Sequence, residues 1–465
     1  MDFSENIYDK HPVYSLSSVL KRDQHEVKYL SFKSNEASKK YFEIFKPELV
    51  LYSCFSSEVF MAVRFDRELK KEFQFHSIIG GPGPTFDRKE INSSTIDAIG
   101  VGEGEIALIE YINSGFLPNP NIILKNSHTD KSKYYPLAKL DDLPFPDRSV
   151  MYDEDIFLRE MPSKQFMAGR GCPYHCTYCH NHIIMDEFKE AGPIFRYKSV
   201  DYLIREIADV KARYPLQNIV FQDDVFILDK KWLREFCDKF PQIINLPFTC
   251  NIRANLINDE IVQLLKESGC VGVSWSIESG NDYLRNKILF RNMSRRVITT
   301  AAEMLNRHGI RHRTGNIVGI PGETFEQMLE TLELNIEIKP YLAMAYTFVP
   351  FPGLALTEYA IKNGHLKPEE IEFIPRTFFK RSVLKFDEAL KDKISKLSLL
   401  FPLLVKFPAL YRIKPIFSTL MTLPLPVLKW VYHWTNIFYT SRMFKVKIAN
   451  EQKFRGLIRY LQSGM

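Results

Sequence analysis

Cysteine is scarce in this chain, which has only seven among 465 residues. Four of them stand alone in apolar surroundings, as is typical of small buried side chains; these are Cys54, Cys237, Cys250 and Cys270. The chain also shows no secretory leader, because residues 1–11 are polar and acidic and contain no apolar core. We therefore expect a reducing, cytoplasmic location.

Long hydrophobic runs and a general excess of positive charge are missing as well. The uncharged stretch 415–428 is too short and too rich in proline to span a bilayer. Residues 391–465 contain 13 Lys and Arg against 2 Asp and Glu, although the whole chain carries only +6. The remainder is therefore slightly acidic, and we expect no nucleic-acid partner.

The three remaining cysteines are concentrated in one short loop. Cys172, Cys176 and Cys179 lie in the sequence GRGCPYHCTYCHN (169–181), with C-x3-C-x2-C spacing. Three thiolates this close can wrap one metal centre, but a tetrahedral structural site needs a fourth ligand. A 4Fe–4S cluster held by three cysteines leaves one iron open for a substrate or cofactor. The alternative is a Cys3His zinc site that includes His180.

This loop resembles the cluster loop of the radical S-adenosylmethionine (SAM) enzymes, in which an aromatic residue precedes the third cysteine, as Tyr178 does here. The resemblance implies that Cys172, Cys176 and Cys179 bind a 4Fe–4S cluster whose open iron chelates SAM, and that Tyr178 lies beside SAM. It also implies that one electron from the cluster cleaves SAM to methionine and a 5′-deoxyadenosyl radical. A reducing donor such as flavodoxin or ferredoxin would supply that electron.

Strand and helix patterns alternate through residues 161–375 and predict a partial (β/α)6 TIM-type barrel. Functional groups are then expected at the carboxyl ends of the strands. The expected strands are 164–168, 218–222, 247–252, 271–277, 314–318 and 343–349. The expected helices are 200–213, 231–240, 259–267, 295–308 and 323–337.

Polar residues follow three of these strands. Asp223 and Asp224 form an acidic pair, which the resemblance places at the SAM ammonium; the alternative is a helix N-cap. Arg253 could pair with the SAM carboxylate or a substrate acid, or form a structural salt bridge. By resemblance, Glu278 takes the SAM ribose hydroxyls or neighbouring polar groups.

Two glycine-rich turns follow the last two strands. The sequence GNIVGIPGE (315–323) resembles the family's G-x-I-x-G-x-x-G-E turn, in which an apolar side chain packs on adenine and glycine admits it. That resemblance singles out Gly315, Ile317 and Gly319. The sequence VPFPG (349–353) resembles the P-x-P-G turn of the same family.

Residues 1–135 alternate helix and strand and predict a doubly wound, Rossmann-like domain. The expected strands are 26–32, 49–53, 76–79 and 97–101, and the expected helices are 13–22, 39–45, 60–71 and one starting at Ile106. Glycines and serines at the strand ends resemble the cobalamin-binding domain that precedes many radical SAM domains. The implied cobalamin contacts are Ser53, Ser56, Gly80, Gly81, Gly102 and Glu103.

The N-terminal domain departs from that family pattern in two ways. Only about ten polar residues precede the first helix, so the domain is expected to lack its first strand. The family's D-x-H-x-x-G motif is also absent, because His25 is followed by Glu26-Val27-Lys28. We therefore expect His25 to lie at the surface and not to bind cobalt.

A proline-punctuated linker (136–160) joins the two domains, and residues 376–465 form a basic, apolar, mostly helical C-terminal region. Its five prolines predict short helices. Basic and aromatic residues within 397–447 suit either peripheral contact with the inner membrane face or a helical cap over the barrel mouth. Either case favours a hydrophobic or lipid-like small-molecule substrate.

Together these resemblances imply a radical SAM enzyme that methylates an unactivated carbon with the help of cobalamin. One alternative is radical oxidation or cyclisation without methyl transfer, as in the related anaerobic porphyrin-ester cyclases. The other is a non-catalytic iron–sulfur or zinc protein that acts as a sensor or scaffold.

Overall fold

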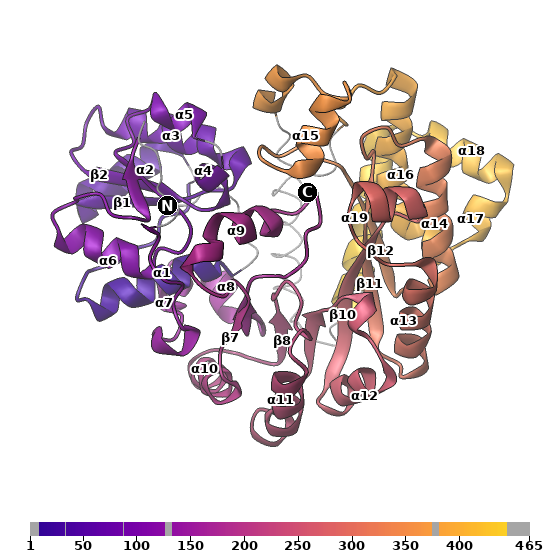
Figure 1. Cartoon of the computed structure of the whole chain (residues 1–465), viewed down its shortest axis with the longest axis horizontal. Coiled ribbons are helices and arrows are strands. Elements are labelled where there is room, and N and C mark those ends of the chain that lie inside the picture. The colour runs from indigo at the N-terminus through magenta and orange to yellow at the C-terminus, as the bar shows by residue number, and fades with distance from the viewer. Residues whose placement is uncertain (1–8, 33, 87, 126–132, 374–380, 444–465) are drawn as a thin grey trace.

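The computed structural model describes residues 9–32, 34–86, 88–125, 133–373 and 381–443. Within this part the chain forms an N-terminal α/β domain, a larger barrel-like parallel sheet and a group of C-terminal helices (Figure 1). The expected features at residues 1–8, 374–380 and 444–465 lie outside the described residues.

The N-terminal domain is a four-stranded sheet with helices on both faces. Its strand order is β1-β2-β3-β4; the first three strands are parallel and β4 is antiparallel. The strands are β1 Leu49–Ser53, β2 His76–Gly80, β3 Ala98–Gly100 and β4 Ile122–Leu124. One face packs against α1 His11–Arg22 and α6 Glu105–Asn113. The other packs against α2 Asn35–Phe45, α3 Val59–Leu69 and α5 Lys89–Asn92. The Rossmann-like prediction is therefore confirmed.

The predicted strand at 26–32 is wrong. This segment is irregular and makes no more than an isolated bridge at Ser31. A strand needs a hydrogen-bonded neighbour, and among the described residues no strand precedes β1 that could pair with it. Its apolar side chains are still used, because Tyr29 is buried and Phe32 packs beside Phe65. His25 is half-buried beside the carboxylate of Asp23.

The barrel contains the six predicted parallel strands. Their order is β12-β11-β10-β9-β8-β5, so each strand lies beside its predecessor in the barrel series. The strands are β5 Ser163–Phe166, β8 Asn218–Phe221, β9 Phe248–Asn251, β10 Cys270–Glu278, β11 Arg311–Val318 and β12 Leu342–Thr347. Right-handed crossovers in one direction place the connecting helices on one face of the sheet. These helices are α10 Val200–Arg213, α11 Lys230–Ile243, α12 Asp259–Glu267, α13 Arg295–Arg307 and α14 Phe325–Ile338.

Shorter elements connect the two domains. The linker carries α7 Ser149–Tyr152 and α8 Ile156–Glu160. After β5, the strand β6 Gly169–Arg170 pairs antiparallel with β7 Arg196–Tyr197, and α9 Asn181–Phe188 lies between them in sequence. Helix α9 runs between the N-terminal domain and the barrel (Figure 1), and its last residue, Phe188, belongs to the core of the N-terminal domain. In sequence the cluster loop lies between β6 and α9.

Two of the four described C-terminal helices are longer than their prolines predict, whereas the other two are short as expected. They are α16 Glu388–Lys406, α17 Ala409–Arg412, α18 Lys414–Thr422 and α19 Leu425–Met443, and both α16 and α19 have 19 residues. Pro426 is the second residue of α19, where a backbone N–H is not needed. Pro402 lies inside α16, and packing compensates for its missing hydrogen bond, because Leu400, Phe401 and Leu404 are buried.

Helix α16 seals the β12 side of the barrel. It packs against β12, α14 and α19, and its Ile394 lies against Gly319 at the end of β11. Residues 397–405, at the start of the region with predicted membrane contact, are therefore part of the core on this side of the barrel. Among the described residues, no helix combines the length and apolarity needed to cross a bilayer.

We expect this packing to dominate the stability of the C-terminal region. Phe401→Ala should lower the free energy of unfolding by roughly 3–5 kcal/mol, because a fully buried phenylalanine leaves a cavity. Phe407→Ala, at a side chain that is 51% exposed, should change it by less than about 1 kcal/mol. Denaturant titration of the two variants measures the difference, and equal losses would contradict the role given to α16.

Candidate functional site

A buried carboxylate fixes the start of the cluster loop. Asp223, just after β8, accepts hydrogen bonds from the backbone N–H of Ala168 at 3.0 Å and of Gly169 at 2.6 Å. Both carboxylate oxygens of Asp223 thus accept hydrogen bonds from the backbone segment that precedes the cysteines. Burial raises the pKa of Asp223 to about 7, although these two hydrogen bonds act in the opposite direction. The structure therefore places Asp223 in a positioning role and leaves Asp224 as the accessible member of the predicted pair.

Close backbone contact explains the two glycines before the first cysteine. A Cβ on Gly169 would lie 2.6 Å from the carbonyl oxygen of Arg196, and one on Gly171 would lie 2.3 Å from that of Ile194. Gly171 also has a backbone φ angle of +87°, which residues other than glycine rarely adopt. The β6–β7 pair therefore forms only with glycine at these positions, and it sets the direction of the cysteine loop.

Two arginines surround Cys176, which is buried. Arg253 and Arg291 each donate from Nη1 to the Cys176 sulfur at 3.6 Å. Arg253 also donates to the carbonyl oxygen of Arg291 and lies 3.8 Å from the centre of the Tyr174 ring. The sequence analysis did not find Arg291, because nothing in its local sequence distinguishes it from a surface arginine.

This environment fits the predicted cluster. A 4Fe–4S cluster with three thiolate ligands is anionic, and buried cations beside one ligand complement that charge. Within the described residues, no three His, Cys, Asp or Glu side chains converge on one metal ion. A cubane binds its three cysteines through different iron atoms, whereas zinc needs all its ligands within about 2.3 Å of one ion.

His180, the fourth ligand of the zinc alternative, packs between aromatic rings. Its ring centre lies 5.5 Å from that of Phe86 in the N-terminal domain and 5.7 Å from that of Phe351 after β12. These two ring contacts join the cluster loop to the N-terminal domain and to the segment that follows β12. The geometry therefore gives His180 a packing role and shows no preformed Cys3His site among the described residues.

Tyr178 and Glu278 meet at the end of β10. The Tyr178 hydroxyl donates to the Glu278 carboxylate at 2.7 Å. Burial raises the pKa of Glu278, and the nearby Arg291 guanidinium lowers it. Glu278 also has φ +71°, so its backbone is held in a strained left-handed conformation. The two residues that the sequence analysis places beside SAM are thus in direct contact.

Asp224 faces the cysteine loop from the end of β8. It is accessible to solvent but has protein atoms on several sides, and this partial desolvation raises its pKa. The side-chain amide of Asn181, at the start of α9, lies near this carboxylate and lowers its pKa. Asp224 also lies close enough to Cys172 and Cys179 to interact with them electrostatically.

The end of β11 completes this side of the barrel. Ile317 packs in the same apolar cluster as Tyr178, and a Cβ on Gly315 would lie 2.8 Å from the Ser276 hydroxyl. Gly319 has φ +73°, and its N–H donates to the Glu323 carboxylate at 2.7 Å. Glu323 is buried and also accepts from the N–H of Ile320 at 3.0 Å. The glycine-rich turn is therefore held by a carboxylate of its own motif.

The predicted cobalamin residues follow β1, β2 and β3 at the carboxyl edge of the N-terminal sheet. Ser53 ends β1, Ser56 begins the next turn and Gly80 ends β2. A Cβ on Gly81 would lie 2.6 Å from the Cys54 carbonyl oxygen, and one on Gly102 would lie 2.4 Å from the Phe188 ring. Position at a strand edge fits a bound cofactor, whereas Gly81 and Gly102 are explained by packing within the chain.

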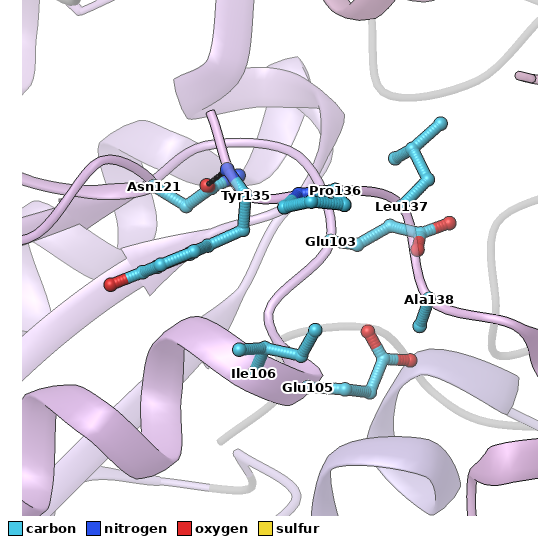
Figure 2. A pocket seen from close by; sticks show the side chains of 8 residues that line it. All are labelled: Glu103, Glu105, Ile106, Asn121, Tyr135, Pro136, Leu137 and Ala138. Atoms are coloured by element: carbon cyan, nitrogen blue, oxygen red, sulfur yellow. Dashed lines mark hydrogen bonds between the residues drawn. The ribbon is translucent and has the colours of Figure 1, made fainter. Parts of the chain in front are cut away.

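Glu103 joins the two domains by ion pairs. Its carboxylate lies 3.2 Å from Nη1 of Arg170 and also contacts Arg196, so it reaches both strands of the β6–β7 pair. Glu105 lies 2.5 Å from Nη2 of Arg170. Figure 2 shows a small pocket that Glu103 and Glu105 line together with residues 135–138. The structure thus gives Glu103 a contact that the sequence analysis did not anticipate.

We expect Asp223 to hold the cysteine loop in place. Asp223→Ala leaves two buried N–H groups without acceptors and should cost roughly 2–5 kcal/mol in the free energy of unfolding. Asp224→Ala, at an exposed carboxylate, should cost less than about 1 kcal/mol. Denaturant titrations and the iron content after reconstitution check this, and full iron incorporation in Asp223→Ala would contradict it.

Glu323 should make stability depend on pH. Burial raises its pKa from 4.5 to about 8, so the folded chain binds more protons than the unfolded chain between these values. The stabilisation that the raised pKa of Glu323 gives to the folded state is therefore present below pH 4.5 and is lost as the pH rises towards 8. Relative to Glu323→Gln, the chain should lose roughly 2–4 kcal/mol of stability from about pH 5 to about pH 8.5. Denaturant titrations at the two pH values measure this, and parallel pH profiles would contradict it.

Two family models match the chain. The radical SAM superfamily matches residues 167–334, and the B12 binding domain matches residues 5–112. The first range contains the cysteine loop and the ends of β8 to β11, and the second contains the predicted cobalamin residues.

Curated relatives carry methyltransferase and cyclase names. An uncharacterized methyltransferase of Pyrococcus horikoshii is 24% identical over 74% of this chain and 77% of its own length. Cytidylyl-2-hydroxyethylphosphonate methyltransferase of Streptomyces wedmorensis is 22% identical over 63% of this chain and 62% of its own length. The anaerobic magnesium-protoporphyrin IX monomethyl ester cyclase of Rubrivivax gelatinosus is 22% identical over 66% of this chain and 57% of its own length.

Solved structures share the fold. The radical SAM methyltransferase TsrM of Kitasatospora setae, solved with tryptophan and a SAM analogue, has a TM-score of 0.64 and 16% identity. That match covers 78% of this chain and 75% of TsrM. The cobalamin-dependent SAM radical enzyme OxsB, solved with aqua-cobalamin and SAM, has a TM-score of 0.59 and 15% identity, over 99% of this chain and 69% of OxsB.

The matched domains identify the cofactors that the fold accommodates. A radical SAM domain implies a 4Fe–4S cluster and SAM, and a B12-binding domain implies a cobalamin. The cysteine loop, the strand ends around it and the two matched domains together show that this chain is an enzyme of the radical SAM superfamily with an N-terminal B12-binding domain.

Proposed function

We propose that this enzyme is a cytoplasmic, cobalamin-dependent methyltransferase that acts on an unactivated carbon of a small molecule. The observation that carries the proposal is the position of the cysteine loop. It starts from a β8 carboxylate, and its Cys176 and Tyr178 reach side chains from the ends of β9 and β10. Two methyltransferases among the curated relatives support the reaction type.

Each residue of the proposed site has a defined task. Cys172, Cys176 and Cys179 hold the cluster, Asp224 receives the SAM ammonium, and Tyr178 and Ile317 form an apolar wall for the adenine. When both are bound, the cluster and SAM supply a 5′-deoxyadenosyl radical that removes a hydrogen atom from the substrate. Glu278, held by Tyr178, binds the ribose hydroxyls.

Methyl transfer depends on the N-terminal domain. Cobalamin supplies a methyl group when bound, and Ser53, Ser56 and Gly80 line the edge that would hold it. The likeness to the Rubrivivax cyclase favours a second candidate, radical oxidation or cyclisation without methyl transfer. The two candidates share the radical step and differ in whether a second SAM is consumed.

We further propose that the substrate is hydrophobic and that the C-terminal helices contact the inner membrane face. Helices α18 and α19 expose Ile416, Val427, Trp430, Trp434 and Phe438. Residues 407–443 contain no Asp or Glu. Exposed tryptophans with basic residues and no acids suit an anionic lipid surface.

The radical step is tested by product analysis. After anaerobic reconstitution with iron, sulfide and cobalamin, the chain should form 5′-deoxyadenosine from SAM when a low-potential reductant is added. Cys176→Ala should lose at least about 100-fold of this activity, because the cluster loses one of its three ligands. S-adenosylhomocysteine together with bound corrin favours methyl transfer; a zinc protein without either product would contradict the enzyme assignment.

The membrane contact is tested with vesicles. The unaltered chain should sediment with vesicles that contain anionic lipid and much less with neutral vesicles. Replacing Trp430 and Trp434 by serine should reduce the bound fraction several-fold, since these side chains are 64% and 52% exposed. Ile243→Ser, at a 58% exposed residue of α11, is the matched control. Equal binding by all three proteins would count against this surface.

A further inference from the structure

Cys176 differs from the other two cysteines of the loop in its contacts. It is the buried one of the three, and two guanidinium groups donate to its sulfur at the same distance of 3.6 Å. Each arginine also donates to a backbone carbonyl oxygen, which holds its guanidinium group beside the sulfur. The pair therefore points to a property of the sulfur itself.

The first arginine is held rigidly at the end of β9. Arg253 is buried, its Nη2 donates to the carbonyl oxygen of Arg291, and its guanidinium lies on the Tyr174 ring. Tyr174 belongs to the cysteine loop, two residues before Cys176. The loop and Arg253 therefore fix one another.

The second arginine sits in a strained loop. Phe290 and Asn292, on either side of Arg291, have φ values of +53° and +50°. Left-handed conformations at residues other than glycine are energetically unfavourable and persist where the surroundings enforce them. Arg291 donates to the Ser276 carbonyl oxygen, and the preceding residue pair, Ile288 and Leu289, accepts hydrogen bonds from Thr177.

The charges around the sulfur are not balanced by protein groups alone. Two buried guanidinium groups face the Glu278 carboxylate, which also accepts the Tyr178 hydroxyl. The Nε atoms of Arg253 and Arg291 are buried and have no hydrogen-bond partner among the described residues. Buried cations need an anionic partner, and a thiolate-bound cluster supplies one at this place.

We propose that Arg253 and Arg291 donate hydrogen bonds to the cluster-binding sulfur of Cys176 and thereby raise the reduction potential of the cluster. The step is a one-electron reduction, [4Fe–4S]2+ to [4Fe–4S]+, by an external low-potential donor such as a reduced flavodoxin or ferredoxin. No bond to cysteine breaks. The added negative charge is placed beside two cations, which stabilises the reduced form. The inference rests on the proposed function, because it requires the cluster at Cys176.

The test is a redox titration of the reconstituted chain without SAM, followed by electron paramagnetic resonance (EPR) of the reduced cluster. Arg291→Met and Arg253→Met should each lower the midpoint potential. At a fixed solution potential near the midpoint, the reduced-to-oxidised ratio should fall about tenfold, which corresponds to about 59 mV for one electron. Arg291→Lys keeps the charge and should give a smaller shift in the same direction, and it serves if a methionine variant does not fold.

Arg285 provides a matched control. It is buried in the adjacent turn and donates to the carbonyl oxygens of Met293, Ser279 and Gly280, and within the described residues it makes no hydrogen bond to a cysteine sulfur. Arg285→Lys should leave the midpoint potential unchanged even where it lowers stability. An equal shift of the midpoint potential in this control would mean that the potential responds to a general destabilisation of the protein, and it would overturn the inference.

Two further outcomes separate the inference from the function on which it rests. If the unaltered chain forms no reducible 4Fe–4S cluster, the proposed function fails. If the cluster forms but its potential is the same in the chain and in the Arg253 and Arg291 variants, only the inference fails. Weaker SAM binding by these variants, measured by calorimetry, with an unchanged potential would assign the arginines to SAM and would likewise overturn it.

Discussion

The Asp223 carboxylate is the interaction on which the geometry of the site depends. It connects the end of β8 to the two N–H groups that follow β5, so it determines where the cysteine loop leaves the sheet. Gly169 and Gly171 then allow β6 to lie against the 194–196 backbone. These contacts determine where the three cysteines lie, whereas Arg253, Glu278 and Ile317 are placed independently by their own strands. The site is assembled where these two sets of constraints meet.

The same segment also fixes the N-terminal domain. Arg170, two residues before Cys172, pairs with Glu103 and Glu105, and Phe188 at the end of α9 enters the N-terminal core. Ion pairs that are partly shielded from water contribute more than exposed ones. The chain on both sides of the cysteines is therefore tied to the B12-binding domain, which suits chemistry that uses groups from both domains.

Sequence patterns predicted the parts of the fold that depend on local burial. The six barrel strands are apolar runs such as Val271 to Ile277, which remain recognisable without knowledge of their neighbours. The strand at 26–32 failed because pairing depends on a partner elsewhere in the chain. The short helices predicted near Pro402 failed because tertiary packing outweighs the loss of one hydrogen bond. Topology and packing, which no local pattern encodes, account for both errors.

The candidate site shows the same division. The cysteines, Tyr178 and the glycine-rich turn follow spacing rules and could be found in the sequence. The different environments of Asp223 and Asp224, the ion pairs of Glu103 and the burial of Arg291 arise only when distant segments meet.

The central claim, that one iron of a three-cysteine cluster stays open for SAM, is tested most directly by EPR of the reduced, reconstituted chain. Adding SAM should change the spectrum of the cluster. A spectrum that SAM leaves unaltered, or the absence of any 4Fe–4S signal, would contradict the account.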